Sequence, residues 1–301
     1  MTLPTDPALP PGRPPLSRPG RKLGPINDNV GSTHRAWLDP MREAYLGSGL
    51  TLNELSGNIR IAKSKLSELL RGLGLYPRWE IVLSLSMELR LPDWPLYRLW
   101  RLAAVEEAHK TCQWIERSSE KAALSTASTP PLDHVAFRQL VEEYYSRYAQ
   151  CFLSDDQRDV AVDHCFDILW LRWNDALSSP DTRRFAWTVM RATVMARTPH
   201  IDGRPNLADA AFDTVALHSS STPADHMYQL TESLHLFKAI SRLPDNQLDV
   251  TVLRHLCGMN DRAVSALLGV SLASVRSDER HALRFLENLI CPPPTTEGNT
   301  A

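Results

Sequence analysis

The stretch "GVSLASVRSDERHALRFL", residues 269–286, has the pattern of the second helix of a helix-turn-helix. Gly269 supplies the permissive backbone that a tight turn needs, and Ser271 is a suitable N-cap for the helix that follows. The apolar residues that recur on one helical face are Val275, Ala282, Leu283 and Leu286. The stretch therefore predicts a helix with one side packed inward and the other side facing outward.

The residues just before this stretch complete the motif. Residues 243–244, a Leu-Pro pair, open a first helix, which Gly258 ends. Asn260 is a good cap for the short helix that leads to Gly269. In a helix-turn-helix the outer side chains of the last helix meet the DNA groove, and Arg or Lys side chains hold phosphates. The expected DNA-contacting positions are Ala273, Ser274, Arg276, Ser277 and Arg280. A plain helical hairpin is the alternative interpretation.

Residues 243–283 resemble the fourth conserved region of extracytoplasmic-function-type RNA polymerase sigma factors. The Leu-Pro opening, the "LLGVS" of residues 267–271 and the "VRS" of residues 275–277 carry this resemblance. It implies recognition of an upstream promoter element. Asp278 and Glu279 depart from the family, whose members carry a basic and an aliphatic residue there. Because Glu279 follows Val275 by four positions, we expect it on the inner line, extended to solvent or paired with a basic neighbour such as Arg276 or Arg280.

A second helical segment, "VAVDHCFDILWLRW", spans residues 160–173. Its inner line is formed by Val162, Phe166, Leu169 and Trp173, and a polar line runs through Asp163 and Asp167. The helices of this part of the chain resemble the second conserved region of the same sigma factors. The resemblance implies that Asp163, Asp167 and Trp170 dock on the β′ subunit of core RNA polymerase. It also matches Arg191 to the promoter-melting helix, although "ARTPHIDGR" replaces the usual basic run. A plain three-helix core is the alternative.

The N-terminal part of the chain holds another helix-turn-helix pattern, "LTLNELSGNIRIAKSKLSELLRG", residues 50–72. Thr51 and Glu54 have the spacing of a capping box. The outward positions of the next helix, expected to contact DNA, are Lys63, Ser64, Lys65 and Ser67. This stretch resembles the Cro/repressor-like helix-turn-helix of bacterial regulators, with Arg60 in place of a turn Gly and Ala62 in place of a Ser or Thr cap. A solvated helix face is the alternative.

Composition limits the other possibilities. The formal net charge of −2 excludes a uniformly basic coat but allows local basic patches. The five cysteines are scattered and odd in number, which indicates reduced thiols in a cytoplasm. No apolar run has the length of a membrane span, and no signal peptide is evident. Because phosphate-binding, nucleophile and zinc motifs are missing, we expect no enzyme activity, no cofactor and no metal site.

The sequence thus predicts an all-α fold of three small helical domains joined by flexible linkers, two of the domains being helix-turn-helix domains. The expected segments are a Pro-rich tail (1–33), a Cro/repressor-like domain (34–108), a linker (109–133), a sigma region-2-like domain (134–198), a linker (199–226), a sigma region-4-like domain (227–291) and a tail (292–301).

From these segments we expect a cytoplasmic, nucleoid-associated transcription regulator that is sigma-factor-like and contacts promoter DNA and RNA polymerase. Two alternatives stay open. One is a protein-interaction regulator that binds polymerase, or an anti-sigma-like protein, without reading DNA, and the acidic pair Asp278–Glu279 favours it. The other is an ordinary DNA-binding repressor or activator with a degenerate sigma-like domain.

Overall fold

The computed structural model describes residues 23–120, 129–207 and 223–290, which we call the N-terminal, middle and C-terminal blocks. The described chain is mostly helical, so the expected all-α class is confirmed. Its strand content is one two-stranded antiparallel hairpin, β1 (His200–Ile201) with β2 (Arg204–Pro205), within the segment expected as a linker. Residues 1–22 and 291–301, which include most of the predicted tails, lie outside the described residues.

The N-terminal block is built from α1 (Ser32–Gly47), α2 (Leu52–Asn58), α3 (Lys63–Leu69), α4 (Trp79–Glu88), α5 (Asp93–Glu106) and α6 (Cys112–Ser119). Trp37, Trp79 and Trp100 are fully buried at its centre. Tyr76 joins two of the helices, because its hydroxyl accepts from the Trp37 ring nitrogen at 3.1 Å and donates to the Trp100 carbonyl at 2.7 Å. The aromatic residues therefore form one connected core.

Two segments of this block extend beyond the expected domain limits. Helix α6 forms inside the predicted linker 109–133, because Thr111 caps it and Ile115 is buried against the core. At the other end, residues 23–31 belong to the predicted Pro-rich tail, yet Val30 is buried and the Asn27 amide donates to the Arg71 carbonyl at 2.9 Å. A helix cap and backbone hydrogen bonds thus give regular structure to two segments whose composition predicted a flexible tail and a flexible linker.

The middle block contains α7 (Leu132–Gln150), α8 (Asp155–Leu171), α9 (Trp173–Ser178) and α10 (Thr182–Arg197), and the C-terminal block contains α12 (Pro223–Ile240), α13 (Asp245–Thr251), the π-helix η1 (Val252–Leu256), α14 (Asp261–Leu268) and α15 (Leu272–Ile290). The expected inner line of α8 is buried, as Val162, Phe166, Leu169 and Trp173 are all 4% exposed or less. On α15, Val275, Ala282 and Leu286 are buried as expected, but Leu283 is 42% exposed. A helix turns by about 100° per residue, which takes Leu283 to the edge of the apolar face.

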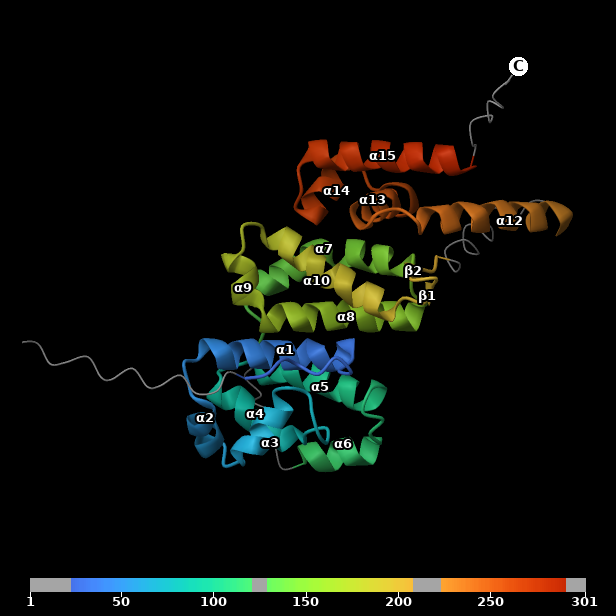
Figure 1. Cartoon of the computed structure of the whole chain (residues 1–301). Helices are drawn as coiled ribbons and strands as arrows, with labels where there is room; N and C mark the ends of the chain where they lie inside the picture. Colours follow the sequence, from blue (N-terminus) through green and yellow to red (C-terminus); the bar gives the residue numbers. More distant parts are fainter. Residues whose placement is uncertain (1–22, 121–128, 208–222, 291–301) are drawn as a thin grey trace, which may run out of the picture.

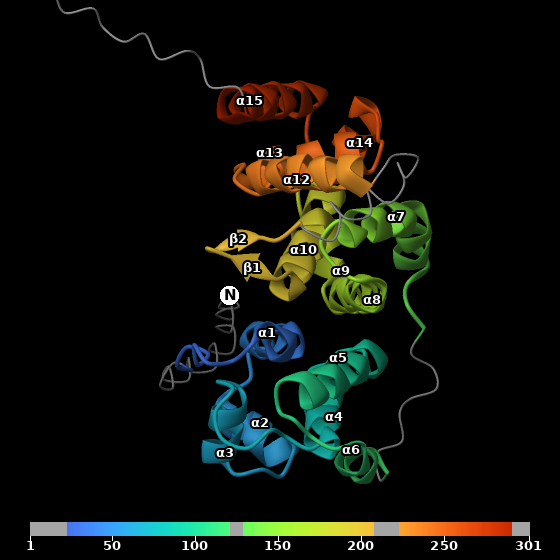
Figure 2. The same ribbon diagram turned by 90° about the vertical axis from the view of Figure 1, so that its right-hand side faces the viewer.

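The middle and C-terminal blocks share one hydrophobic core, whereas the N-terminal block has its own. In Figure 1, α8 lies between α7 and α10 on one side and α1 and α5 on the other, and Figure 2 shows the same order from the side. The three blocks are therefore stacked, with the middle block in contact with both others.

Asp249 of α13 connects the C-terminal block to the middle block through buried hydrogen bonds. Its carboxylate is 3% exposed and accepts from the Tyr148 hydroxyl at 2.7 Å and the Trp187 ring nitrogen at 3.0 Å. The Arg191 guanidinium completes the network at 3.0 Å. Burial raises the pKa of Asp249, while Arg191 and the two neutral donors oppose that rise. The network satisfies every member, as a buried charge requires.

Candidate nucleic-acid interface

The N-terminal helix-turn-helix consists of α2 and α3. The predicted capping box is present, because the Glu54 amide donates to Thr51 Oγ1 at 3.2 Å and the Thr51 amide donates to Glu54 Oε2 at 2.7 Å. The Thr51 amide and hydroxyl both donate to the Glu54 carboxylate, and these two hydrogen bonds lower the pKa of Glu54. Leu55 of α2 and Leu66 of α3 are fully buried, so each helix keeps its outer face for solvent.

The turn between α2 and α3 has the two weaknesses that the sequence suggested. Arg60 adopts φ +57°, in the left-handed region that a residue with a Cβ rarely occupies. Ala62 stands at the N-cap of α3 and supplies no side-chain hydrogen bond. A left-handed non-glycine residue costs about 1–2 kcal/mol, and a missing cap costs about 0.5–2 kcal/mol. The surrounding core therefore holds this turn in place.

The outward side chains of α3 form a polar ridge. Lys63, Ser64 and Lys65 are exposed, and Ser67 is half-buried. Neither lysine makes an ion pair anywhere in residues 23–120, 129–207 or 223–290. Beside the ridge lies a groove of about 950 Å³ that Lys63, Ser64 and Ser67 line together with other residues. The ridge thus combines free positive charge with hydroxyl groups.

The C-terminal helix-turn-helix consists of α14 and α15. Asn260 caps α14 by accepting from the Ala263 amide at 2.9 Å, and Ser271 accepts from the Ser274 amide at 3.1 Å at the start of α15. Gly269 forms the turn at φ +64°. A Cβ placed on Gly269 would lie 2.5 Å from the backbone nitrogen of Arg184 in α10. The turn therefore requires glycine both for its conformation and for its close contact with the middle block.

The predicted outer positions of α15 are accessible. Ala273, Ser274, Arg276 and Arg280 are exposed, and Ser277 is half-buried. The two arginines already have local partners: Arg276 Nε lies 3.0 Å from Asp261 Oδ2, and Arg280 Nε donates to the Arg276 carbonyl at 3.3 Å. The cationic character of this face is therefore weaker than that of α3.

The acidic pair in α15 separates into two different environments. The Glu279 side chain is only 16% exposed, and its Oε1 lies 3.2 Å from Arg254 Nε and 3.2 Å from His255 Nε2 of the π-helix η1. The expected inner position of Glu279 and its pairing with basic residues are confirmed, but its partners are Arg254 and His255 of η1, not Arg276 or Arg280. Asp278 is half-buried, and no ion pair of this residue is found within the described chain. Only one acid of the pair therefore stays near the outer face.

Of the three residues expected to bind polymerase, Asp167 is covered by the N-terminal block, whereas Asp163 and Trp170 are partly exposed. Asp167 is 5% exposed, and Arg98 of α5 reaches it with an Nε–Oδ2 distance of 2.9 Å. Asp163 lies 2.7 Å from Arg138 Nη2 and 3.7 Å from Arg98 Nη2, and Trp170 is half-buried. Burial raises the pKa of Asp167 to about 7, because lost hydration outweighs the opposing effect of Arg98.

A partner approaching this acidic face would therefore meet α5. Sequence reasoning did not single out Arg98 or Arg138, because no local pattern connects either one to α8. Arg191, the residue matched to promoter melting, is likewise engaged within the chain by Asp249 at 3.0 Å and Asp245 at 2.9 Å. In this arrangement, docking through Asp167 or contact through Arg191 requires the blocks to separate.

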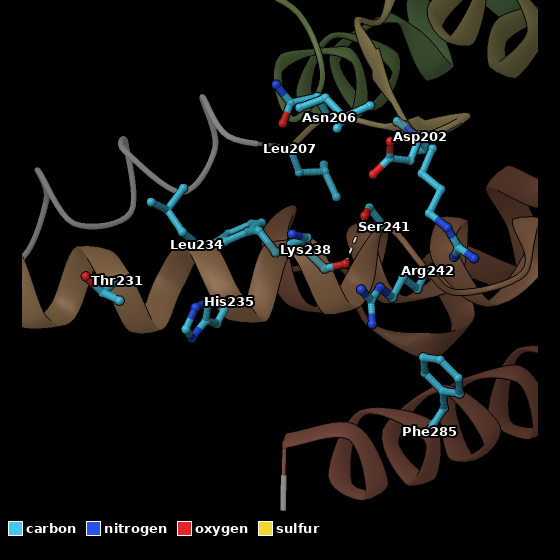
Figure 3. A pocket seen from close by; sticks show the side chains of 14 residues that line it. Asp202, Asn206, Leu207, Thr231, Leu234, His235, Lys238, Ser241, Arg242 and Phe285 are labelled. Carbon is cyan, nitrogen blue, oxygen red and sulfur yellow. Dashed lines mark hydrogen bonds between the residues drawn. The ribbon is translucent and has the colours of Figure 1, made fainter.

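A basic cavity of about 840 Å³, which the sequence did not indicate, opens between the hairpin, α12 and α15 (Figure 3). Lys238 and Arg242 of α12 and its following turn line it, with Arg204 from β2 and Phe285 from α15. The exposed cations Arg204, Lys238 and Arg242 have no ion pair in the part of the chain that the structure describes. The cavity therefore adds positive potential to the C-terminal block.

Among the described residues, no three His, Cys, Asp or Glu side chains form a group suited to holding a metal ion. Within the same residues, no helix is both long and apolar enough to cross a bilayer. Comparison with known protein families, curated proteins and solved structures gave no match for this chain.

Proposed function

We propose that the chain is a DNA-binding transcription regulator whose main contact is the α3 ridge, Lys63, Ser64, Lys65 and Ser67. The observation that carries this proposal is that Lys63 and Lys65 are both exposed in the first turn of α3 and form no ion pair with any other described residue. Lysines in such a position hold phosphates, and adjacent hydroxyls hydrogen-bond to base edges or to the sugar-phosphate backbone. The fixed positive charge makes binding strongly dependent on salt.

Helix α15 supplies a second and weaker contact. Ser274 and Ser277 offer hydroxyls on the outer face, and Arg280 offers an exposed cation that donates a hydrogen bond to the Arg276 backbone carbonyl. Arg276 contributes to phosphate binding only when a phosphate replaces Asp261 as its partner. Two such surfaces on one chain raise the overall affinity when both sites on the DNA lie within reach.

The internal engagement of Asp167 and Arg191 favours DNA binding without polymerase docking. In the sigma-like mechanism, the acidic face of α8 has to be open to the β′ subunit, whereas here Arg98 covers Asp167. The sigma-like resemblance is compatible with this, because a regulator that keeps the fold of a sigma factor need not keep its partner. Polymerase binding remains the second candidate function.

The decisive experiment is a gel-shift titration of the full chain on a duplex of mixed sequence about three helical turns long. The double variant Lys63→Glu, Lys65→Glu should bind at least about tenfold more weakly, and its dependence on salt should be shallower by about two counterions. The matched control is Arg101→Glu, Arg117→Glu, which makes the same change in net charge at exposed positions of α5 and α6. It should bind like the parent chain.

If the two double variants bind equally weakly, the effect comes from net charge and not from the position of Lys63 and Lys65. If both bind like the parent chain, α3 does not contact the DNA. Polymerase docking is tested separately by capture of core polymerase. Arg98→Ala frees the acidic face, so capture by this variant but not by the parent chain would select the second candidate function. Capture by neither would leave DNA binding alone.

A further inference from the structure

Cys151 and Cys257 are 106 residues apart in sequence, and their sulfur atoms lie 4.0 Å from each other. Cys151 is the C-cap of α7 in the middle block, and Cys257 is the C-cap of η1 in the C-terminal block. Both side chains are half-buried, so a small solute can reach them from solvent. The pair therefore stands at the boundary between two blocks, and both residues are partly exposed.

The surroundings of the pair favour thiolate formation at Cys257. The hydrogen bond between the two sulfurs lowers the pKa of the Cys257 thiol; burial opposes this shift, and the nearby Arg147 guanidinium adds to it. The thiolate is the reactive form of cysteine toward electrophiles. A low-pKa thiol with a second thiol in reach is the arrangement of cysteines that oxidise reversibly.

The other described cysteines differ from this pair. Cys165 is fully buried, and burial raises the pKa of its thiol, both of which make it inert. Cys112 is exposed but lies on α6 of the N-terminal block. Cys291 lies outside the described residues. Cys112 therefore serves as an internal comparison, an accessible thiol in a different block.

We propose that Cys151 and Cys257 form a modification site that a hydroperoxide converts to a disulfide linking the middle and C-terminal blocks. The Cys257 thiolate attacks one peroxide oxygen, the O–O bond breaks, and the other oxygen leaves after protonation, as water from hydrogen peroxide or as an alcohol from an organic hydroperoxide, which makes Cys257 a sulfenic acid. The Cys151 sulfur then attacks the sulfenic sulfur and forms the S–S bond, and the sulfenic hydroxyl leaves with the Cys151 proton as water. The two thiols lose two electrons and the peroxide gains them.

Little movement is needed for this reaction. The sulfur atoms must close from 4.0 Å to the length of a disulfide, about 2.05 Å, and both lie at helix ends. The product ties α7 to η1, the element that holds Glu279 of α15 through Arg254 and His255. Oxidation thus fixes the C-terminal helix-turn-helix to the middle block. This inference does not depend on the proposed function.

The test is oxidation of the reduced full chain with a small excess of hydrogen peroxide, followed by alkylation and peptide mapping without reductant. We expect loss of two alkylatable thiols per chain, a cross-linked peptide containing Cys151 and Cys257, and full reversal by dithiothreitol. Cys112 should remain alkylatable throughout. The Cys112→Ser variant should give the same cross-link at the same rate.

The single variants separate a true pair from independent oxidation. In Cys151→Ser, a reagent specific for sulfenic acid should label Cys257, and no intramolecular cross-link should appear. In Cys257→Ser, oxidation of Cys151 should slow to the rate of Cys112. Faster oxidation of Cys112 than of the pair in the parent chain, a cross-link only between chains, or irreversible oxidation of either sulfur without a cross-link would overturn the proposal.

Discussion

The two helix-turn-helix motifs of this chain differ in how well their turn residues and helix caps suit the local backbone. In the C-terminal motif, Gly269 meets the demand of a left-handed turn, and Asn260 and Ser271 cap the two helices. In the N-terminal motif, Arg60 takes the left-handed position and Ala62 leaves α3 without a side-chain cap. The C-terminal motif is locally well matched to its fold, whereas the N-terminal motif depends on its core.

The same two motifs differ in how their charges are used. In the C-terminal motif, Arg276 pairs with Asp261, and Arg254 pairs with Asp261 and Glu279. In the N-terminal motif, Lys63 and Lys65 have no ion pair with any other described residue. The comparison teaches that local fit and availability for a partner are separate properties. The motif with the poorer turn keeps the more available cations.

The largest expected effect concerns the core that the C-terminal motif shares with the middle block. Asp249→Ala leaves the half-buried Arg191 without its main partner and the buried Tyr148 and Trp187 donors without an acceptor. We expect the free energy of unfolding to fall by about 3–5 kcal/mol, measured by urea denaturation. Glu54→Ala, which breaks only the capping box of the N-terminal motif, should cost about 1 kcal/mol. Similar losses of stability for the two variants would contradict the view that the buried Asp249 network contributes more than the exposed capping box.

The next effect concerns the C-terminal turn. Gly269→Ala introduces a Cβ at φ +64° and 2.5 Å from the Arg184 backbone nitrogen, which cannot yield as a flexible side chain would. The backbone conformation and the clash together should cost about 2–4 kcal/mol, measured by thermal unfolding. Gly57→Ala serves as a control, because a Cβ there meets no atom within 4 Å. A loss below about 1 kcal/mol would show that α14 and α10 separate easily.

A smaller effect than that of Gly269→Ala is expected from acid, which should destabilise the core of the N-terminal block. Burial lowers the pKa of His34 to about 4, so its neutral form is favoured in the folded chain, while the unfolded chain takes up a proton near pH 6.5. This contribution is fully present above pH 6.5 and is lost as the pH falls toward 4. Between pH 7 and pH 5.5 it should cost about 1 kcal/mol.

Hydrogen exchange resolved by peptide measures this effect in α1 and α5. His34→Gln should flatten the pH dependence of exchange there and leave α13 and α15 unchanged. His164, whose pKa burial lowers to about 3, should impose its own acid dependence on the middle block, which the His34 variant retains. An unchanged pH dependence in α1 would exclude His34 as the source.

The smallest effect has the opposite sign. Arg60→Gly relieves the left-handed strain in the N-terminal turn, and part of this gain is offset by the greater freedom of glycine in the unfolded chain. We expect a net increase of about 0.5–1 kcal/mol in the free energy of unfolding, measured by urea denaturation. A loss of stability would indicate that the Arg60 side chain contributes to the fold. DNA binding should be unchanged, because the α3 ridge keeps its residues.

Much of the local structure was predictable, because its signals act over a few residues. The capping box at Thr51, the cap at Asn260 and the turn at Gly269 are all where the pattern put them. The outward faces of α3 and α15 also follow from helical spacing, since every buried position on one side places others in solvent. Helix α6 and the hairpin were missed because composition alone had marked their segments as linkers.

The sequence by itself determined the two helix-turn-helix segments with their caps and turns, and which side chains of α3 and α15 face outward. Tertiary structure alone decided that Glu279 pairs with Arg254, that Arg98 covers Asp167, and that Cys151 meets Cys257. The physical reason is range. Caps and helical stripes depend on backbone hydrogen bonds and side-chain spacing within one or two turns, whereas these pairs depend on how separate helices pack.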